Sequence, residues 1–230
     1  MKLGIIGGVG PLAGYDFGKR LTKATPVKND QDHINAILLS DTSIPDRTEY
    51  ILGKSKINPL LKLSEDVNIL NKLNVDRIAI ICNTAHFFYE ELAKISNAKI
   101  YNMVDITMSS HINHKIGLIS TQGTKNSKIY DKYAEKYNIE LITLDDFHQE
   151  ICTNIIYSQV KNNLEICEKD FRAICDYLFS KGCEHIILGC TELSTAKVQF
   201  LLNDIYIDPV NELIKEIVTD FYGGNLCVDS

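Results

Sequence analysis

The sequence has no Cys-x-x-Cys pair, no basic stripe, and no apolar run near the roughly 20 residues that a bilayer span needs. Its seven cysteines are an odd number, so neither a disulfide framework nor a zinc ribbon is expected. The start, MKLGIIGG, reaches its glycines too early for a signal peptide. We therefore predict reduced thiols in a cytoplasmic protein that has no membrane partner.

The composition is that of an ordinary globular protein. Its 230 residues are 45% hydrophobic and 23% charged, which is enough apolar material for a substantial core. The length allows one large domain or two of about 100 residues each. The formal net charge of −6 argues against nucleic-acid binding, but it does not exclude an anionic small-molecule ligand.

Short β-branched runs alternate with helical patterns along the chain. Apolar residues recur at helical spacing over 60–73, after Pro59, and over 164–178, before Gly182. The alternation predicts an α/β fold with mostly parallel sheets flanked by helices. The predicted strands are residues 2–7, 35–40, 77–82, 98–103, 115–120, 139–144, 185–190 and 204–207.

An internal repeat divides this pattern in two. KLGIIGGVG from Lys2 resembles KIGLISTQG from Lys115, 113 positions later, and the cysteines of RIAIICNTAH and EHIILGCTEL lie 108 positions apart (82 to 190). We predict two pseudo-twofold-related α/β halves, residues 1–98 plus 208–230 and residues 99–207. The last helix should pack back on the first half. Because ligands bind at the carboxyl ends of parallel strands, the active site is expected in the cleft between the halves.

Cys82 and Cys190 each end a buried strand and precede a predicted helix. Two thiols on opposite sides of a cleft can serve as the two bases of a racemase: one removes a proton from a carbon, and the other returns one to the opposite face. Helix N-terminal N–H groups, with Thr84 or Thr191, favour a thiolate. A buried core cysteine is the simpler interpretation. We adopt it for Cys152, Cys167, Cys175 and Cys183, and we place Cys227 in a frayed tail.

Five blocks resemble the cofactor-independent aspartate/glutamate racemase family, in its aspartate branch. They follow the family's order and span most of the chain. The resemblance implies interconversion of L- and D-aspartate or glutamate by one cysteine from each half, with neither pyridoxal phosphate nor a metal. A homodimer is the expected assembly. The blocks are GIIGGVGPLA (4–13), QDHINAILLSDTSIPDRT (31–48), CNTAH (82–86), STQGT (120–124) and GCTEL (189–193).

The resemblance also implies substrate-binding residues. Arg47 and Lys161 would meet the distal carboxylate, since a buried carboxylate needs a charged partner. The alternatives are a surface ion pair of Arg47 with Asp46 and a solvated helix end for Lys161. Residues near the cysteines would bind the α-carboxylate and amino group: Asn83, Thr84, Thr121 and Thr191. The remaining substrate-site candidates are Gly8, Val9, Gly10, Gly123, Thr124 and Glu192.

Two positions depart from the family's pattern. Val9 stands where methionine is frequent, which changes the shape expected of the pocket. Glu192 stands where related glutamate racemases usually carry histidine. A carboxylate there should raise the pKa of the neighbouring thiol, Cys190. Within the resemblance, glutamate in place of histidine at this position implies the aspartate-type branch.

The histidines and the glycine turn indicate neither a metal site nor a nucleotide site, whereas the role of His86 and the reaction type remain open. His86 is either structural or a partner of Cys82, and His33, His111, His114 and His185 show no metal-ligand spacing. The glycine turn lacks the G-x-G-x-x-G spacing of a nucleotide site. The alternative functions are a maleate isomerase, hydantoin racemase or arylmalonate decarboxylase reaction, and non-catalytic binding of a dicarboxylate.

Overall fold

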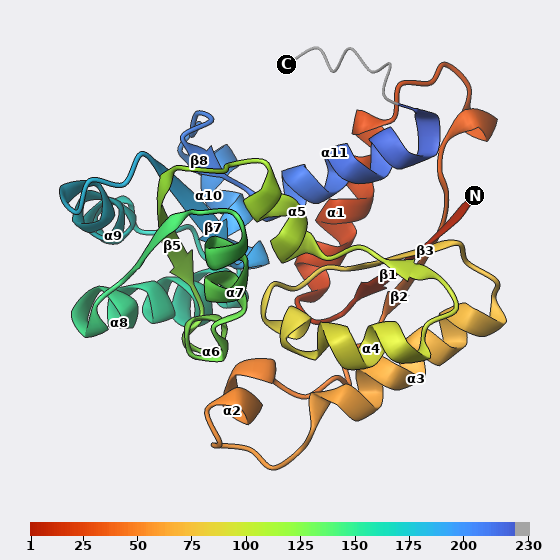
Figure 1. Ribbon diagram of the computed structural model, residues 1–230, viewed down its shortest axis with the longest axis horizontal. Coiled ribbons are helices and arrows are strands. Elements are labelled where there is room, and N and C mark those ends of the chain that lie inside the picture. Colours follow the sequence, from red (N-terminus) through yellow and green to blue (C-terminus); the bar gives the residue numbers. More distant parts are fainter. Residues whose placement is uncertain (224–230) are drawn as a thin grey trace.

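The computed structural model describes residues 1–223, which form two four-stranded parallel sheets (Figure 1). The strand orders are β2-β1-β3-β4 and β6-β5-β7-β8, so the second sheet repeats the first. This repetition confirms the predicted α/β fold with two similar halves. The strands are β1 (Lys2–Gly7), β2 (Asn35–Ser40), β3 (Arg77–Ile80), β4 (Lys99–Ile100), β5 (Lys115–Ser120), β6 (Glu140–Thr143), β7 (His185–Gly189) and β8 (Tyr206–Ile207).

Helices cover both faces of each sheet. On the first sheet, α3 and α4 pack on one face and α1 and α11 on the other. On the second, α8, α9 and α10 pack on one face, and α7 and α5 on the other. The helices are α1 (Pro11–Ala24), α2 (Arg47–Ile51), α3 (Pro59–Lys72), α4 (Tyr89–Ile95), α5 (Met103–Ser109), α6 (Gln122–Ser127), α7 (Ile129–Lys136), α8 (Asp146–Asn154), α9 (Glu168–Ser180), α10 (Ser194–Gln199) and α11 (Pro209–Tyr222).

The helix that follows each sheet packs on the opposite sheet. After β4, α5 places Val104 and Met108 in the core of the second half. After β8, α11 places Leu213 and Ile217 in the core of the first half, as predicted for the last helix. The two helices pack on each other between the sheets (Figure 1). The halves are therefore connected by two crossing helices.

Local chemistry explains the sharp turn after β1. Gly8 has a φ of +80°, and a Cβ at this position would lie 2.3 Å from the carbonyl oxygen of Asp41. Only glycine fits both the left-handed conformation and this close approach. The turn leads into α1, which has Pro11 at its start, a position where the missing N–H has no consequence.

Some predicted boundaries differ from the structure. β4 pairs with β3, so Lys99 and Ile100 belong to the first sheet, although the predicted boundary put them in the second half. The division into domains otherwise stays a prediction. The expected helix from Leu164 begins only at Glu168, because Asn163 turns the chain with a φ of +58°. Cys167 is exposed rather than core, and Cys227 lies outside the described residues.

Over residues 1–223, no helix combines the length and apolarity that a membrane crossing requires. α11 alternates buried and exposed positions, as is typical of a helix that covers one face of a sheet. The charged side of α11 carries Glu212, Lys215 and Asp220.

Asp66 of α3 is a buried carboxyl, 3% exposed, whose Oδ2 has no hydrogen-bond partner among the described residues. Burial, with the negative charges of Asp41 and Glu65, raises the pKa of Asp66 to about 6. Because this pKa is higher in the folded chain than in the unfolded chain, stability present below about pH 4 is lost as the pH rises through 6.

We expect Asp66→Asn to stabilise the fold by about 2 kcal/mol at pH 8 and to have no effect near pH 4. Urea unfolding of both proteins at the two pH values measures the difference. Asp131→Asn, which alters an exposed carboxyl on α7, should change neither value. Equal stability of Asp66→Asn and the parent protein at pH 8 would contradict the prediction.

Candidate active site

The carboxyl ends of β3 and β7 bring Cys82 and Cys190 to one narrow cavity. Both side chains are buried, with 6% and 5% exposure. The cavity has a volume of about 10 Å³, roughly what one water molecule needs. The residues around it come from both halves, so the site lies between them: Val9, Asp46, Arg47, Thr48, Cys82, Asn83, Thr84, Thr121, Tyr157, Lys161, Cys190, Thr191 and Glu192.

Arg47 lies beside Cys82. Its Nη2 donates to the Val9 carbonyl at 2.7 Å and its Nη1 to the Pro45 carbonyl at 3.1 Å. Burial acts to lower the pKa of Arg47, but the negative charges of Cys82 and Asp46 outweigh it and raise the pKa. The side chain is thus a buried cation in the site. A surface ion pair with Asp46, the alternative considered from the sequence, is not formed.

Glu192 lies beside Cys190. The Cys190 thiol donates to Glu192 Oε2 at 2.9 Å, and the Thr191 hydroxyl donates to the same oxygen at 3.2 Å. Burial and the Glu192 charge raise the pKa of Cys190 well above its ordinary value. This confirms the effect expected of a carboxylate two residues after the second cysteine. The two thiols therefore have opposite electrostatic surroundings.

Two buried donors of the site have no partner among residues 1–223. They are Nε of Arg47 and Nδ2 of Asn83. The Asn83 side chain is oriented by Tyr130, whose hydroxyl donates to Asn83 Oδ1 at 2.6 Å. A buried donor without an acceptor is costly, and a carboxylate has oxygens for both. The cavity beside Cys82 is therefore suited to an anionic ligand.

Hydroxyl groups join the halves behind the cysteines. Thr84 Oγ1 lies 3.1 Å from the hydroxyl of Thr121 and 2.8 Å from that of Thr124. Gly123 lies against Thr48, where an added Cβ would be 2.7 Å from the Thr48 Cα. Gly123 and Thr124 therefore pack behind the cavity and do not line it.

A wider cavity of about 660 Å³ opens beside the narrow one and shares Val9, Arg47, Lys161, Thr191 and Glu192 with it. We call it the vestibule. Gly8 and Gly10 also line it. Its apolar wall is formed by side chains such as Leu12, Ile44 and Val160. The vestibule therefore adjoins the narrow cavity that both thiols line.

Lys161 enters the site and is not an isolated helix end. Its Nζ lies 4.2 Å from the ring centroid of Tyr157 and 3.9 Å from Asp46 Oδ2. Sequence reasoning missed Asp46, Thr48 and Tyr157 as lining residues. Asp46 and Thr48 flank Arg47 in the motif that was recognised, whereas Tyr157 stands four residues before Lys161. The spacing of four residues between Tyr157 and Lys161 is about one helical turn, which places both side chains on one side of a helix, and this was the signal available in the sequence.

His86 is structural. Its Nδ1 lies 2.9 Å from the Cys82 carbonyl, and its Nε2 accepts from the Met103 N–H at 3.1 Å. Burial lowers the pKa of His86, so the ring is neutral. Both ring nitrogens are occupied by the backbone, and His86 does not pair with the Cys82 thiol. Among residues 1–223, no three His, Cys, Asp or Glu side chains are grouped to hold a metal ion.

The structure is similar to those of known racemases. A Picrophilus torridus aspartate racemase has a TM-score of 0.79 and 28% identity, with 96% of this chain and 94% of that chain covered. An aspartate racemase homologue from Pyrococcus horikoshii OT3, with a TM-score of 0.75, 22% identity and coverage of 96% and 98%, shares the fold. The broad specificity amino-acid racemase RacX of Bacillus subtilis is 26% identical over 205 residues, 84% of this chain and 86% of that protein.

The fold, with its two repeated α/β halves, and the similarity to these racemases identify an isomerase of the racemase class. The model of the Asp/Glu/Hydantoin racemase family matches residues 6–217. The chain belongs to this family.

The Glu192 carboxylate should keep Cys190 protonated. We expect Glu192→Gln to lower the pKa of Cys190 and to raise its rate of alkylation by iodoacetamide at pH 8 by about 3- to 10-fold. Peptide mass spectrometry measures Cys190 separately from Cys82. Glu184→Gln, an exposed change at the other end of β7, serves as the control. An unchanged or slower alkylation of Cys190 in Glu192→Gln would refute the prediction.

Proposed function

We propose that the protein racemises an acidic amino acid by proton transfer between Cys82 and Cys190. The thiolate of one cysteine removes the α-proton, which leaves a carbanion, and the thiol of the other gives its proton to the opposite face. The charges of the two sulfurs are thereby exchanged. Both proton transfers use protein thiols, so the proposed reaction has no step for pyridoxal phosphate or a metal. The observation that carries the proposal is the meeting of both thiols in one cavity that also holds unpaired buried donors.

The surroundings of the thiols suit a starting state with one charged sulfur. The Arg47 guanidinium compensates a negative charge on Cys82. The raised pKa of Cys190 keeps that thiol protonated. In this state Cys82 is the base and Cys190 the acid, and the reverse reaction starts after the proton has moved.

The unpaired donors favour a dicarboxylic substrate. Asn83 Nδ2, with the hydroxyls of Thr84 and Thr121, is placed to bind one carboxylate, and Arg47 Nε with Lys161 to bind the second. Aspartate and glutamate have this chemistry. The likeness to an aspartate racemase and to a broad specificity amino-acid racemase supports the proposal.

The direct test follows L-aspartate and, separately, L-glutamate in D₂O with the purified protein and no added cofactor. We expect loss of the α-proton in NMR together with appearance of the D-enantiomer in chiral chromatography. Cys82→Ser and Cys190→Ser should each reduce inversion by at least about 100-fold, because serine is a far weaker acid than cysteine. Cys167→Ser, at an exposed cysteine, should retain full activity.

Other outcomes of this experiment identify the other candidates. Saturable binding of either acid without exchange or inversion would support the alternative of a non-catalytic dicarboxylate-binding protein. Consumption of the acid, or its isomerisation without a D-enantiomer, would indicate another reaction of the superfamily. Inversion that survives in either serine variant would refute the two-thiol mechanism.

We further propose a homodimer formed through the outer surface of α3 and α4. Leu61 and Ile69 on α3 and Leu73 directly after it are 67%, 43% and 41% exposed, and Ile95 of α4 is 40% exposed. Exposed apolar residues at helical spacing are typical of a covered surface. The proposed location is the cytoplasm, since the reaction needs both thiols reduced.

Sedimentation equilibrium should give twice the monomer mass of 25.9 kDa. Leu61→Asp should shift the protein to monomer, whereas Leu201→Asp, at an exposed position after α10, should leave the dimer intact. A parent protein that stays monomeric at all concentrations would exclude the proposed dimer.

A further inference from the structure

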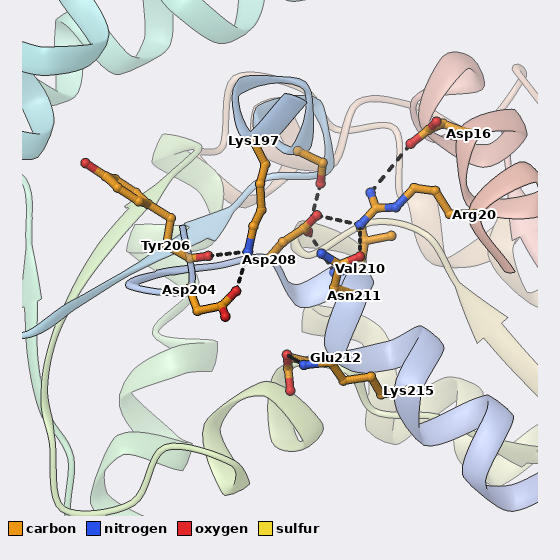
Figure 2. A network of polar contacts seen from close by, with 11 residues as sticks. Asp16, Arg20, Lys197, Asp204, Tyr206, Asp208, Val210, Asn211, Glu212 and Lys215 are labelled. Atoms are coloured by element: carbon orange, nitrogen blue, oxygen red, sulfur yellow. Dashed lines mark hydrogen bonds and ion pairs between the residues drawn. The ribbon is translucent and has the colours of Figure 1, made fainter. Parts of the chain in front are cut away.

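The start of α11 carries a buried polar network (Figure 2). Asp208, only 2% exposed, accepts from Arg20 Nη2 at 2.6 Å through Oδ2. Its Oδ1 accepts from the Ser194 hydroxyl at 2.8 Å and from the Val210 N–H at 3.0 Å. Arg20 also donates to the Asn211 side chain. Asp208 thus joins three helices: α1 of the first half, α10 of the second half, and α11.

This network lies directly behind the second cysteine. Ser194 is four residues beyond Cys190, and the intervening turn is closed by the Leu193 N–H, which donates to the Cys190 carbonyl at 2.9 Å. The same turn carries Glu192, and Ser194 also lines the vestibule. Because Arg20 belongs to the other half, the network ties the turn of Cys190 to the first half. We call Arg20, Asp208 and Ser194 the Cys190 clamp.

A matching arrangement lies behind the first cysteine. Asn102, at the start of α5, accepts from the Asp105 N–H at 3.0 Å and donates to the Tyr133 hydroxyl of α7 at 2.7 Å. His86, four residues beyond Cys82, accepts from the Met103 N–H. We call His86, Asn102 and Tyr133 the Cys82 clamp.

The two clamps correspond under the internal repeat. Arg20 and Tyr133 are 113 positions apart (20 to 133), as are Lys2 and Lys115 at the starts of β1 and β5. Asn102 and Asp208 each begin the crossing helix after the last strand of a half. The chemistry differs, since one clamp is an ion pair and the other is neutral, but the place in the fold is the same. The feature that recurs behind both cysteines is therefore a polar network at the start of a crossing helix, and the ion pair occurs only behind Cys190.

We propose that Asp208, held by Arg20, is a positioning residue that sets the place of Cys190 relative to the substrate. This inference rests on the proposed function. Both cysteines line the same narrow cavity, and a displacement of a reacting group by about 1 Å costs on the order of 100-fold in rate. Asp208 acts through Ser194 and the turn, and it does not touch the reacting atoms.

The test separates proton removal from proton delivery. In D₂O, Asp208→Asn should still exchange the α-proton of the enantiomer that Cys82 deprotonates, with a loss below about threefold, while inversion falls by at least about tenfold. From the opposite enantiomer, exchange and inversion should fall together, because Cys190 is then the base. Ser194→Ala, which keeps the Asp208–Arg20 pair, should give the same asymmetry to a smaller extent.

Two further variants make the comparison specific. Tyr133→Phe removes the corresponding bond at the Cys82 clamp and should give the opposite asymmetry between the enantiomers. Asp220→Asn removes a similar ion pair on the same helix, that with Arg77 at 2.6 Å, at the end remote from Asp208. It should leave the ratio of exchange to inversion unchanged.

A second readout does not depend on racemase activity. In Asp208→Asn, the iodoacetamide alkylation rate of Cys190 should change by at least about threefold relative to that of Cys82, since only the turn that carries Cys190 is released. Equal loss of exchange and inversion from both enantiomers, or an unchanged ratio of the two alkylation rates, would overturn the proposal. A parent protein that shows neither exchange nor inversion would instead contradict the proposed function, and the alkylation ratio would still decide the role of Asp208.

Discussion

The close approach of the two halves along the carboxyl edges of their sheets is the constraint on which the site depends. Gly123 has no room for a side chain against Thr48, and the Tyr130 hydroxyl reaches across to Asn83 at 2.6 Å. These contacts narrow the space between the thiols to about 10 Å³. This narrow space adjoins the vestibule, with which it shares Val9, Arg47 and Lys161. The crossing helices α5 and α11 hold the halves in this arrangement (Figure 1).

The repeated fold makes the positions of the two thiols alike, but their electrostatic surroundings differ. A buried cation, Arg47, lies beside Cys82, whereas a carboxylate, Glu192, accepts a hydrogen bond from the Cys190 thiol at 2.9 Å. A two-base racemase needs one charged and one protonated group at the start of each turnover. In the proposed reaction, these unequal neighbours favour Cys82 as the charged group and Cys190 as the protonated group.

Much of the fold was readable from the sequence because the signals are local. Parallel strands buried on both faces are continuously apolar, and each predicted run contains one of the eight strands. The repeated strand-and-cysteine pattern predicted two similar halves, and the structure shows that their sheets also share one strand order. The start of α9 was misplaced because the left-handed turn at Asn163 depends on backbone conformation, which an apolar spacing pattern does not report.

The sequence by itself determined the residue types of the site: two cysteines at strand ends, Arg47 and Lys161 as cations, and Glu192 beside the second thiol. Only the tertiary structure decided which of their atoms are free to act. Two Arg47 nitrogens donate to backbone carbonyls and Nε is unpaired. Asp208 accepts from Ser194, four residues after Cys190, and from Arg20 of the other half. These pairings join residues far apart in the chain, and burial sets their strength, so neither spacing nor composition reveals them.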